Sequence, residues 1–387
     1  MLRVVSTRVE RSALLELIEQ LVAIDSVNPT LVPGGRGEAE IGRYVADWLA
    51  RAGLEVEVEE VAPDRPNVVG IARGRGRGRS LLLNAHMDTV GFGGMAEPLR
   101  ARLVDDRVHG RGAYDMKASL AAIMLVGAVA ANSDFGGDVI IGAVADEEAE
   151  SNGSAALAAR LRTDAAIVAE PTELELCVAH KGFAWLEVET RGVAAHGSRY
   201  DEGVDAIARM GPVLSGIAEL DRSLRDDRPL HPLLGGGSLH ASLIEGGTEL
   251  STYPDRCVAK LERRTLPGES AADVEAEIRA LLPDDASVRT LFVREPLETA
   301  VDEGIVQALL RIGERILGAA PEIVGKPWWA DAALFASAGT PTVVFGPVGT
   351  GAHADVEWVD LGSVLQCAEI LIAVAREFCG GDLSGRG

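Results

Sequence analysis

Several short apolar segments of this sequence lead directly into a histidine or an acidic residue, and this pattern constrains the fold more than any other feature. Residues 81–85, 139–145 and 165–169 are predominantly apolar and have the length of a strand. Strands that are apolar along their whole length are buried on both faces, as in sheets covered by helices. Segments with helical spacing of apolar residues alternate with them, at 12–23, 38–51 and 117–131. This alternation predicts an α/β sheet flanked by helices.

The pattern changes between about residues 178 and 292. Residues 182–190 alternate between apolar and acidic side chains, as an antiparallel strand does. The following segments predict a helix at 204–220, strands at 239–244 and 256–264, and a helix at 271–282. A chain of 387 residues is also longer than one hydrophobic core usually accommodates. We therefore expect a domain with a helix-flanked mixed sheet, formed by residues 1–177 and 293–387, and a small α+β domain inserted at 178–292.

The composition excludes several classes of protein. The formal net charge of -22 and the pI of about 4.8 argue against a nucleic-acid-binding surface. The cysteines are far apart in the sequence, which predicts reduced and buried side chains. The N-terminus lacks the apolar core of a signal peptide, and the longest apolar run, residues 120–131, is shorter than a membrane span. We expect a cytoplasmic protein with neither nucleic-acid nor membrane partners.

An alternation of arginine and glycine over residues 73–79 allows two interpretations. It could bind phosphate groups, or it could be a solvated connection between two strands. We favour the connection, because flexibility of a glycine-rich segment would blur any binding site.

Segments that carry metal-binding side chains recur along the chain, at 81–88, 110–117, 146–148, 169–172 and 351–355. In the first of them, His86 and Asp88 are two residues apart in extended backbone, so they project to the same side. His86 could bind a metal ion through one ring nitrogen while Asp88 orients the other. Each segment alone has a simpler explanation, such as a structural histidine or an aspartate that caps a helix.

The five segments together make a stronger case than any one of them. They supply two histidines and at least three carboxylates, all predicted at one edge of one sheet. Acidic groups packed at a buried edge need cations. The set fits two adjacent Zn²⁺-class ions about 3.5–4 Å apart that share a bridging carboxylate and leave room for a water between them. A neighbouring carboxylate would then serve as the general base.

The order of these motifs resembles that of a known family. The motifs H-M-D, G-R-G-A-Y-D-M-K, D-E-E, A-E-P-T and G-A-H-A-D follow one another between residues 86 and 355. They resemble the M20 metallopeptidase family, which includes acetylornithine deacetylases, succinyl-diaminopimelate desuccinylases, aminoacylases and glutamate-releasing carboxypeptidases. The resemblance covers nearly the whole chain. It implies a catalytic domain of the zinc-exopeptidase type with an inserted lid and dimerisation domain.

The resemblance also assigns metal ligands to individual residues. It implies that His86, Asp115 and Glu170 hold one divalent ion. Asp115, Glu148 and His353 would hold the other, with Asp115 as the bridge. Zinc is the expected metal, with cobalt and manganese as alternatives.

Two further acidic residues receive roles from the same resemblance. Glu147 would be the general base that activates the water and shuttles its proton. Asp88 would orient His86. Members of the family also have a cis peptide bond after the bridging aspartate, so the Asp115–Met116 bond should be cis.

The inserted domain carries the residues expected to meet the substrate. His196 matches a lid histidine that reaches the active site of a partner subunit and stabilises the oxyanion. Arg264 matches the arginine that grips the substrate carboxylate, with Arg263 as the alternate. The sequence departs from the family at Ser251, where asparagine is frequent, and at Glu262, where aspartate is usual. These departures lie on the substrate side and leave the substrate open.

The function implied by the resemblance is hydrolysis of a small amide by a homodimer. Glu170 is typical of the deacylase and carboxypeptidase members, so we predict cleavage of a small N-acyl-L-amino acid, as in acetylornithine deacetylase. The alternative is a carboxypeptidase that releases glutamate or cleaves other small, dipeptide-like substrates. A non-catalytic binding protein with this fold should have lost Glu147 or a ligand, and none is missing. The motifs of serine hydrolases and of P-loop nucleotide-binding proteins are absent from the sequence.

Overall fold

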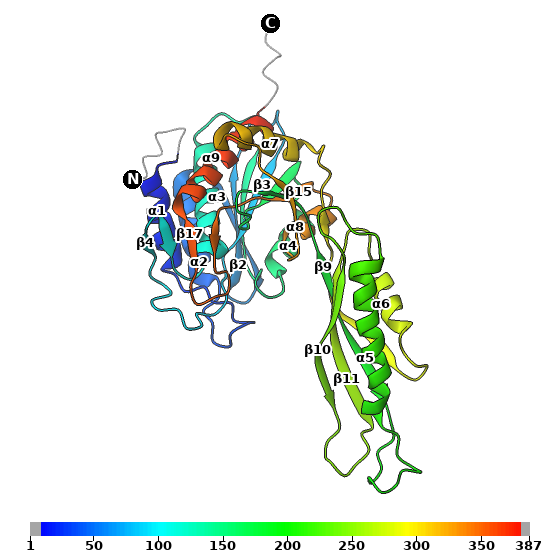
Figure 1. The fold of residues 1–387 in the computed structure, drawn as a ribbon. Helices are drawn as coiled ribbons and strands as arrows, with labels where there is room; N and C mark the ends of the chain where they lie inside the picture. The colour runs from blue at the N-terminus through cyan, green and yellow to red at the C-terminus, as the bar shows by residue number, and fades with distance from the viewer. Residues whose placement is uncertain (1–8, 381–387) are drawn as a thin grey trace. The chain divides into compact units, whose positions relative to one another are not determined.

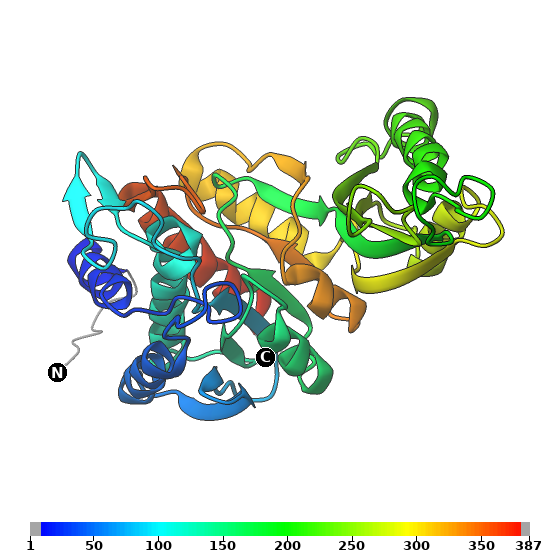
Figure 2. The ribbon, with the colours of Figure 1, turned by 90° about the horizontal axis from the view of Figure 1, so that it is seen from below.

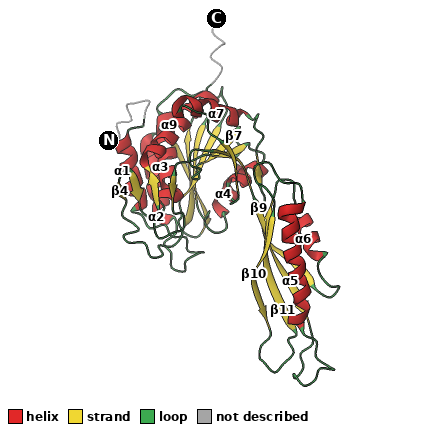
Figure 3. Cartoon of the chain, viewed as in Figure 1, coloured by secondary structure: helices red, strands yellow, loops and turns green. Residues whose placement is uncertain are grey.

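A computed structural model of the chain describes residues 9–380, and these residues form two compact units. The first unit comprises the chain up to Val178, Thr299–Val324 and the chain from Ala330 onward. The second comprises Ala179–Glu298 and Gly325–Trp329. Helices and strands of both units are distinguished in Figure 3. The mixed α/β architecture expected from the sequence is confirmed, with a central mixed sheet in the first unit.

The sheet of the first unit runs in the order β1-β2-β6-β3-β7-β15-β8. Its strands are β1 (Glu55–Ala62), β2 (Arg65–Ala72), β3 (Leu81–His86), β6 (Val139–Val144), β7 (Ala165–Val168), β8 (Leu176–His180) and β15 (Thr342–Val344). The short strands β13 (Leu297–Glu298) and β14 (Ile323–Lys326) also pair with β8. β3 is parallel to β6 and to β7, and every residue of these three strands is buried. Their carboxyl ends therefore lie at one edge of the sheet.

Helices cover both faces of this sheet (Figure 1). One layer is formed by α1 (Arg11–Val22), α2 (Ala39–Ala52), α3 (Ala118–Ala131), α7 (Gly304–Leu317) and α9 (Leu361–Phe378), and the other by α4 (Asn152–Arg160) and α8 (Ala332–Ser337). Among residues 9–380, one helical stretch, Ala113–Ala131, is long and apolar enough to cross a membrane. Of its most apolar part, 89% is buried inside the molecule, as expected for the central helix of a globular core.

A second, smaller sheet joins two loops of the first unit. It runs in the order β16-β17-β5-β4, with β4 (Arg102–Val104), β5 (Arg107–His109), β16 (Gly349–Thr350) and β17 (Trp358–Asp360). The sequence did not predict these strands, which are too short to show a period of two. After β5 the chain makes an irregular turn at Ala113–Lys117, in which Asp115 and Met116 leave helical conformation. The Asp115–Met116 peptide bond is cis, as the resemblance predicted.

The second unit has a sheet in the order β10-β11-β9-β12 with its helices on one face (Figure 2). Its elements are β9 (Gly182–Arg191), α5 (Ala206–Arg222), a short helical turn (Ser223–Asp227), β10 (Ser238–Gly246), β11 (Arg256–Thr265), α6 (Ala271–Arg279) and β12 (Ser287–Arg294). Asp205 caps α5, and Ser270 and Asp273 form a capping box at α6. This unit reaches Glu298 and takes in residues 325–329, so it extends beyond the interval 178–292 expected from the sequence.

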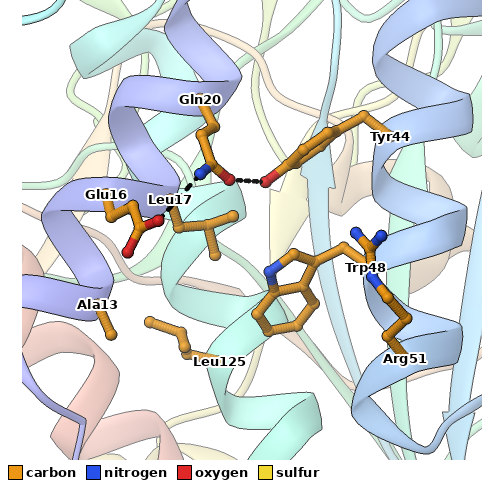
Figure 4. A pocket seen from close by; sticks show the side chains of 8 residues that line it. All are labelled: Ala13, Glu16, Leu17, Gln20, Tyr44, Trp48, Arg51 and Leu125. Carbon is orange, nitrogen blue, oxygen red and sulfur yellow. Dashed lines mark hydrogen bonds between the residues drawn. The ribbon is translucent and has the colours of Figure 1, made fainter. Parts of the chain in front are cut away.

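A cavity of ≈ 540 Å³ lies between α1, α2 and α3 (Figure 4). Leu17, Trp48 and Leu125 supply its apolar wall. The hydroxyl of Tyr44 donates a hydrogen bond to the side-chain oxygen of Gln20 there. The cavity holds none of the histidines and acidic residues singled out in the sequence. The predicted chemistry must therefore be sought elsewhere in the first unit, at the carboxyl edge of the large sheet.

Candidate metal centre

His86, the last residue of β3, stands at the centre of the candidate site. Its side chain is buried, and its Nε2 lies 3.1 Å from Asp115 Oδ1 and 3.6 Å from Glu170 Oε1. Glu170 follows β7, which pairs in parallel with β3. The apolar strands thus fix where these two side chains emerge, because the strands end side by side at the same edge of the sheet.

Asp115 lies between the two histidines of the site. Its Oδ1 faces His86, and its Oδ2 lies 3.4 Å from His353 Nε2. The same His353 nitrogen lies 2.9 Å from Glu148 Oε2. Each oxygen of this carboxylate therefore faces a different histidine nitrogen, an arrangement in which one carboxylate could bridge two ions.

Donor atoms converge in two groups. His86, Asp115 and Glu148 form one group, and His86, Glu147 and Glu170 form the other. Within each group the donor atoms all lie within 4.8 Å of one another. With His353 beside Glu148, the structure brings together the predicted ligands and the predicted base at one place, although they come from segments far apart in the sequence.

The electrostatics of this cluster favour a cation. Burial, together with the charges of neighbouring acidic groups, raises the pKa of both Glu147 and Glu170 well above the usual range. Burial and the charge of Asp115 raise the pKa of Glu148 to about 7. Glu148 Oε1 and Glu170 Oε1 have no hydrogen-bond partner within the described part of the chain. The carboxylates of the cluster repel one another, and two of their oxygens lack a hydrogen-bond partner among residues 9–380. Together with the two imidazoles they form a donor set that fits Zn²⁺-class ions.

Asp88 contacts both His86 and the acidic turn that follows β6. His86 Nδ1 lies 2.9 Å from the backbone oxygen of Asp88 and 3.5 Å from its Oδ1, so the opposite ring nitrogen is left for a metal ion. The Asp88 carboxylate also accepts hydrogen bonds from the backbone N–H groups of Glu147, at 3.2 Å, and Glu148, at 3.1 Å. The sequence did not predict these hydrogen bonds between Asp88 and the acidic turn.

Glu357 is another functional residue that sequence reasoning missed. It is buried, and its carboxylate accepts hydrogen bonds from the backbone N–H groups of Gly112, Tyr114 and Asp115 at 2.9–3.1 Å. The Arg111 guanidinium donates to it at 2.7 Å. Glu357 therefore ties the loop that carries His353 to the turn that carries Asp115. The available signal was an acidic residue between the apolar residues Val356 and Trp358.

Asp331, at the start of α8, is a further buried carboxylate near the site. Burial raises its pKa to about 6, against the opposing effect of the nearby hydroxyls of Ser151 and Ser154. Its own charge contributes to the raised pKa of Glu147 and Glu170. Nothing in the local sequence around Asp331 indicated this position.

The residues predicted to meet the substrate lie in the second unit. His196 and Ser251 are exposed in adjacent loops, where the backbone N–H of Gly197 donates to the Ser251 carbonyl at 2.7 Å. His196 Nδ1 lies 2.9 Å from Ser198 Oγ. These contacts hold the loop that presents the His196 ring.

The two neighbouring arginines of β11 have opposite surroundings. Arg263 is fully buried, pairs with Glu269 at 2.6 Å and donates to the carbonyl of Arg264, so its guanidinium is engaged within the second unit. Arg264 is partly exposed, pairs with Glu262 at 2.8 Å and lies over the ring of Phe183. The apolar residues two and four positions before Arg263 already indicated that it faces the core.

Comparison with known proteins identifies the family. The sequence profile described as peptidase family M20/M25/M40 matches residues 82–377. The chain belongs to this family. The acetylornithine deacetylase of Myxococcus xanthus is 28% identical to the chain over 388 aligned positions, covering 95% of the chain and 98% of that relative.

Solved structures of M20 peptidases share the fold. The aminopeptidase PepT of Bacillus cereus superposes with a TM-score of 0.78 at 19% identity, over 96% of this chain and 99% of that one. The Bacillus subtilis YXEP protein, a dinuclear metal-binding peptidase, superposes with a TM-score of 0.72 at 16% identity, over 95% and 98%. With the family established and a candidate metal site present, this M20 protein is a metal-dependent hydrolase of amide or peptide bonds.

Proposed function

We propose that this M20 hydrolase removes the acyl group of a small N-acyl-L-amino acid at a centre of two divalent ions. The observation that carries the proposal is the position of Asp115, whose two oxygens face His86 and His353 separately. Such a carboxylate can bridge two ions. The likeness to acetylornithine deacetylases over nearly the whole chain supports the substrate class.

The proposed ligand sets are those that the resemblance to the family implies. His86, Asp115 and Glu170 would hold one ion, and Asp115, Glu148 and His353 the other. The short distances from His86 and from His353 to these carboxylates support both sets. Zinc is the expected metal, with cobalt and manganese as alternatives, and the bound ions would supply Lewis-acid polarisation of the amide carbonyl.

Glu147 is the proposed general base. Its carboxylate would take a proton from the attacking water and deliver it to the leaving amine. In the metal-free site its burial beside Glu170 and Asp331 raises its pKa, which is the direction that favours a proton acceptor. Asp88 would hold the His86 ring in the orientation that presents its Nε2 to the metal ion.

The second unit would complete the site. We propose that Arg264 binds the substrate carboxylate, for which its guanidinium suits bidentate contact. His196 would stabilise the oxyanion in the active site of a partner subunit, which makes the enzyme a homodimer. The partly exposed Arg264 and the exposed His196 support these roles.

Metal removal tests the two-ion centre. Dialysis against a chelator should abolish turnover, and zinc, cobalt or manganese should restore it. Elemental analysis of the active protein should give about two ions per chain. Full activity in a sample shown to be metal-free would refute the proposal.

A substrate screen tests the reaction. The metal-loaded protein is supplied with N-acetyl and N-succinyl amino acids and with dipeptides, and the released amine is measured. Preference for the N-acyl amino acids would support the deacylase. Preference for dipeptides or for substrates that release glutamate would assign the carboxypeptidase instead.

A further inference from the structure

A group of buried polar residues lies behind the acidic turn of the metal centre, and the proposed reaction does not use it directly. Its members are Asn28, Glu38, Arg65 and Asp146, all in the first unit and each less than a tenth exposed. Buried polar side chains in such numbers are costly unless every one is paired. Their pairing shows what they hold in place.

Asp146 begins the turn that carries Glu147 and Glu148. Its φ of 72° lies in the left-handed region, which is uncommon for a residue other than glycine. Its backbone N–H donates to Glu38 Oε1 at 3.0 Å, and its Oδ2 accepts from Asn152 Nδ2 at 2.6 Å. Its Oδ1 accepts from Arg65 Nη1 at 2.7 Å. The unusual backbone conformation is therefore held from several directions.

Arg65, on β2, is the cation of this group. Its guanidinium forms a two-pronged pair with Glu38, through Nε at 2.8 Å and Nη2 at 2.6 Å. Its Nη1 reaches Asp146 and also Thr30 Oγ1, at 3.0 Å. A lysine could supply the charge but not this planar set of donors.

Asn28 connects the turn to the metal ligand His86. Its Nδ2 donates to Asp88 Oδ2 at 2.7 Å and to Asp146 Oδ1 at 3.2 Å. Asp88, in turn, holds the backbone N–H groups of Glu147 and Glu148 and lies against His86. One amide group therefore joins the two carboxylates that fix the acidic turn.

We propose that Asn28 and Arg65 are positioning residues of this hydrolase. They hold Asp146 and Asp88 so that Glu147 and Glu148 enter the site in the orientation that the reaction needs. The inference rests on the proposed roles of Glu147 as base and Glu148 as ligand. Groups that orient metal ligands typically change metal affinity or activity by about 10–100-fold when they are lost, and a shift of about 1 Å in a reacting group can cost about 10²-fold.

The alternative is that these residues only stabilise the fold. Substitution would then lower the melting temperature and leave turnover and metal affinity of the folded protein unchanged. The two possibilities therefore differ in measurements made on folded, metal-loaded protein, and both kcat and metal affinity are needed to separate them.

The test uses Arg65→Lys and Asn28→Asp. Arg65→Lys keeps the charge without the fork of donors, and Asn28→Asp keeps the shape but replaces the shared donor with a third carboxylate. Arg160→Lys is the matched control, because Arg160 pairs with Glu57 and Glu59 on the surface. Asn132→Asp is the second control, since its amide donates to the backbone carbonyls of Ala52 in α2 and Ala128 in α3, away from the acidic turn.

Three quantities are measured: kcat, KM and the affinity for Co²⁺ titrated into metal-free protein and followed by visible absorption. For Arg65→Lys and Asn28→Asp we expect kcat to fall about 10–100-fold, while KM stays within a few-fold of the wild-type value. One of the two Co²⁺ ions should bind more weakly by a similar factor, because Glu148 is displaced while Glu170 is not. The controls should match the wild type in all three quantities.

A melting temperature that falls while kcat and both Co²⁺ affinities stay within a few-fold of wild type would overturn the inference. If Arg65→Lys does not fold, the double variant Glu38→Gln/Arg65→Gln removes the Glu38–Arg65 ion pair without changing the net charge, while Asp146 keeps its hydrogen bonds from Asn28 and Asn152. The same outcomes then support or overturn the inference. Failure of the proposed function is distinguishable, because wild-type protein would then cleave no N-acyl amino acid, while the Co²⁺ titration would still report on the turn.

Discussion

Glu147 is the residue on which the proposed reaction most depends. It follows Asp146 in the turn after β6, and its backbone N–H is held by Asp88. Its side chain stands beside the proposed ligand Glu170 in one of the two donor groups. The same turn thus carries the proposed base and, one residue later, the proposed ligand Glu148.

Glu147→Gln should abolish most activity without emptying the site. Glutamine keeps the shape but cannot accept the proton, so kcat should fall by about 10²–10⁴-fold. Metal content, measured by elemental analysis, should stay at the wild-type value. Glu150→Gln, an exposed position in the same turn, is the control. Activity of Glu147→Gln within a few-fold of wild type would show that another group is the base.

The clustered ligands also predict how the metal-free protein responds to pH. Burial first, and then the Asp115 charge, raise the pKa of Glu148 from an ordinary 4.5 to about 7. Hydrogen bonds to Asp115 and Glu148 raise the pKa of His353 from 6.5 to about 10. Above about pH 7 the burial of Lys117, which lowers its pKa to about 7, opposes the effect of His353. From about pH 5 to 7 the raised pKa of Glu148 makes the folded state bind more protons than the unfolded state, so the free energy of unfolding should fall as pH rises.

Calorimetry at several pH values measures this effect. The melting temperature of metal-free protein should decrease from about pH 5 to 7, the range in which Glu148 loses its proton in the folded state. Added zinc replaces the protons and binds more tightly as pH rises, so the gap between loaded and metal-free protein should widen. A metal-free melting temperature that rises with pH over this range would contradict the proposed protonation of the site.

At the scale of elements, two loops far apart in the sequence are fastened together at the site. The turn after β5 carries Asp115, and the loop between β16 and β17 carries His353. The carboxylate of Glu357, just before β17, accepts several backbone N–H groups of that turn. The small sheet that contains β5 and β17 brings the two loops into contact.

Glu357→Gln should therefore weaken the centre without touching a ligand. The new amide keeps one oxygen as an acceptor, but its NH₂ group must face either the N–H groups of Tyr114 and Asp115 or those of Gly112 and Arg111, so the turn must shift. We expect metal affinity and kcat each to fall by about 10–100-fold, measured by Co²⁺ titration and by turnover. Asp355→Asn is the control, since this exposed carboxylate accepts from Gly94. Unchanged Co²⁺ affinity in folded Glu357→Gln would show that the hydrogen bonds from the Asp115 turn to Glu357 are not needed for metal binding.

At the scale of the whole molecule, the proposed ligands and the proposed substrate contacts lie in different units. The ligands and Glu147 belong to the first unit, and His196 and Arg264 to the second. If His196 serves the active site of a partner subunit, catalysis requires two chains. This arrangement can be tested by combining inactive variants.

His196→Ala should lower kcat by about 10²–10³-fold, as loss of one oxyanion donor does, with metal content unchanged. Mixing His196→Ala with Glu147→Gln under conditions that exchange subunits should partly restore activity, because one site in each mixed dimer then combines an intact base with an intact histidine. Mixing Glu147→Gln with Asp115→Asn should restore nothing, since both defects lie in the first unit. No recovery in proven heterodimers of the first pair would place His196 outside the partner's site.

The sequence by itself determined the α/β class and much of the site. Buried strands need apolar side chains on both faces, so a histidine or a carboxylate directly after such a strand stands out from the sequence alone. Parallel strands end at one edge, which was sufficient to bring His86, Glu148 and Glu170 together. Asp115 and His353 belong to loops, and they were placed by the ordered motifs shared with the M20 family.

Only the tertiary structure decided how these groups are held. Glu357 pairs with a turn more than 240 positions away, and Arg65 with Asp146 at a separation of 81. No local period reports such pairs, because a buried charge selects its partner by proximity in the fold and not by spacing in the chain. The strands β4, β5, β16 and β17 have two or three residues each, which is too few for an alternation to be visible. Their pairing depends on the loops that the large sheet brings side by side.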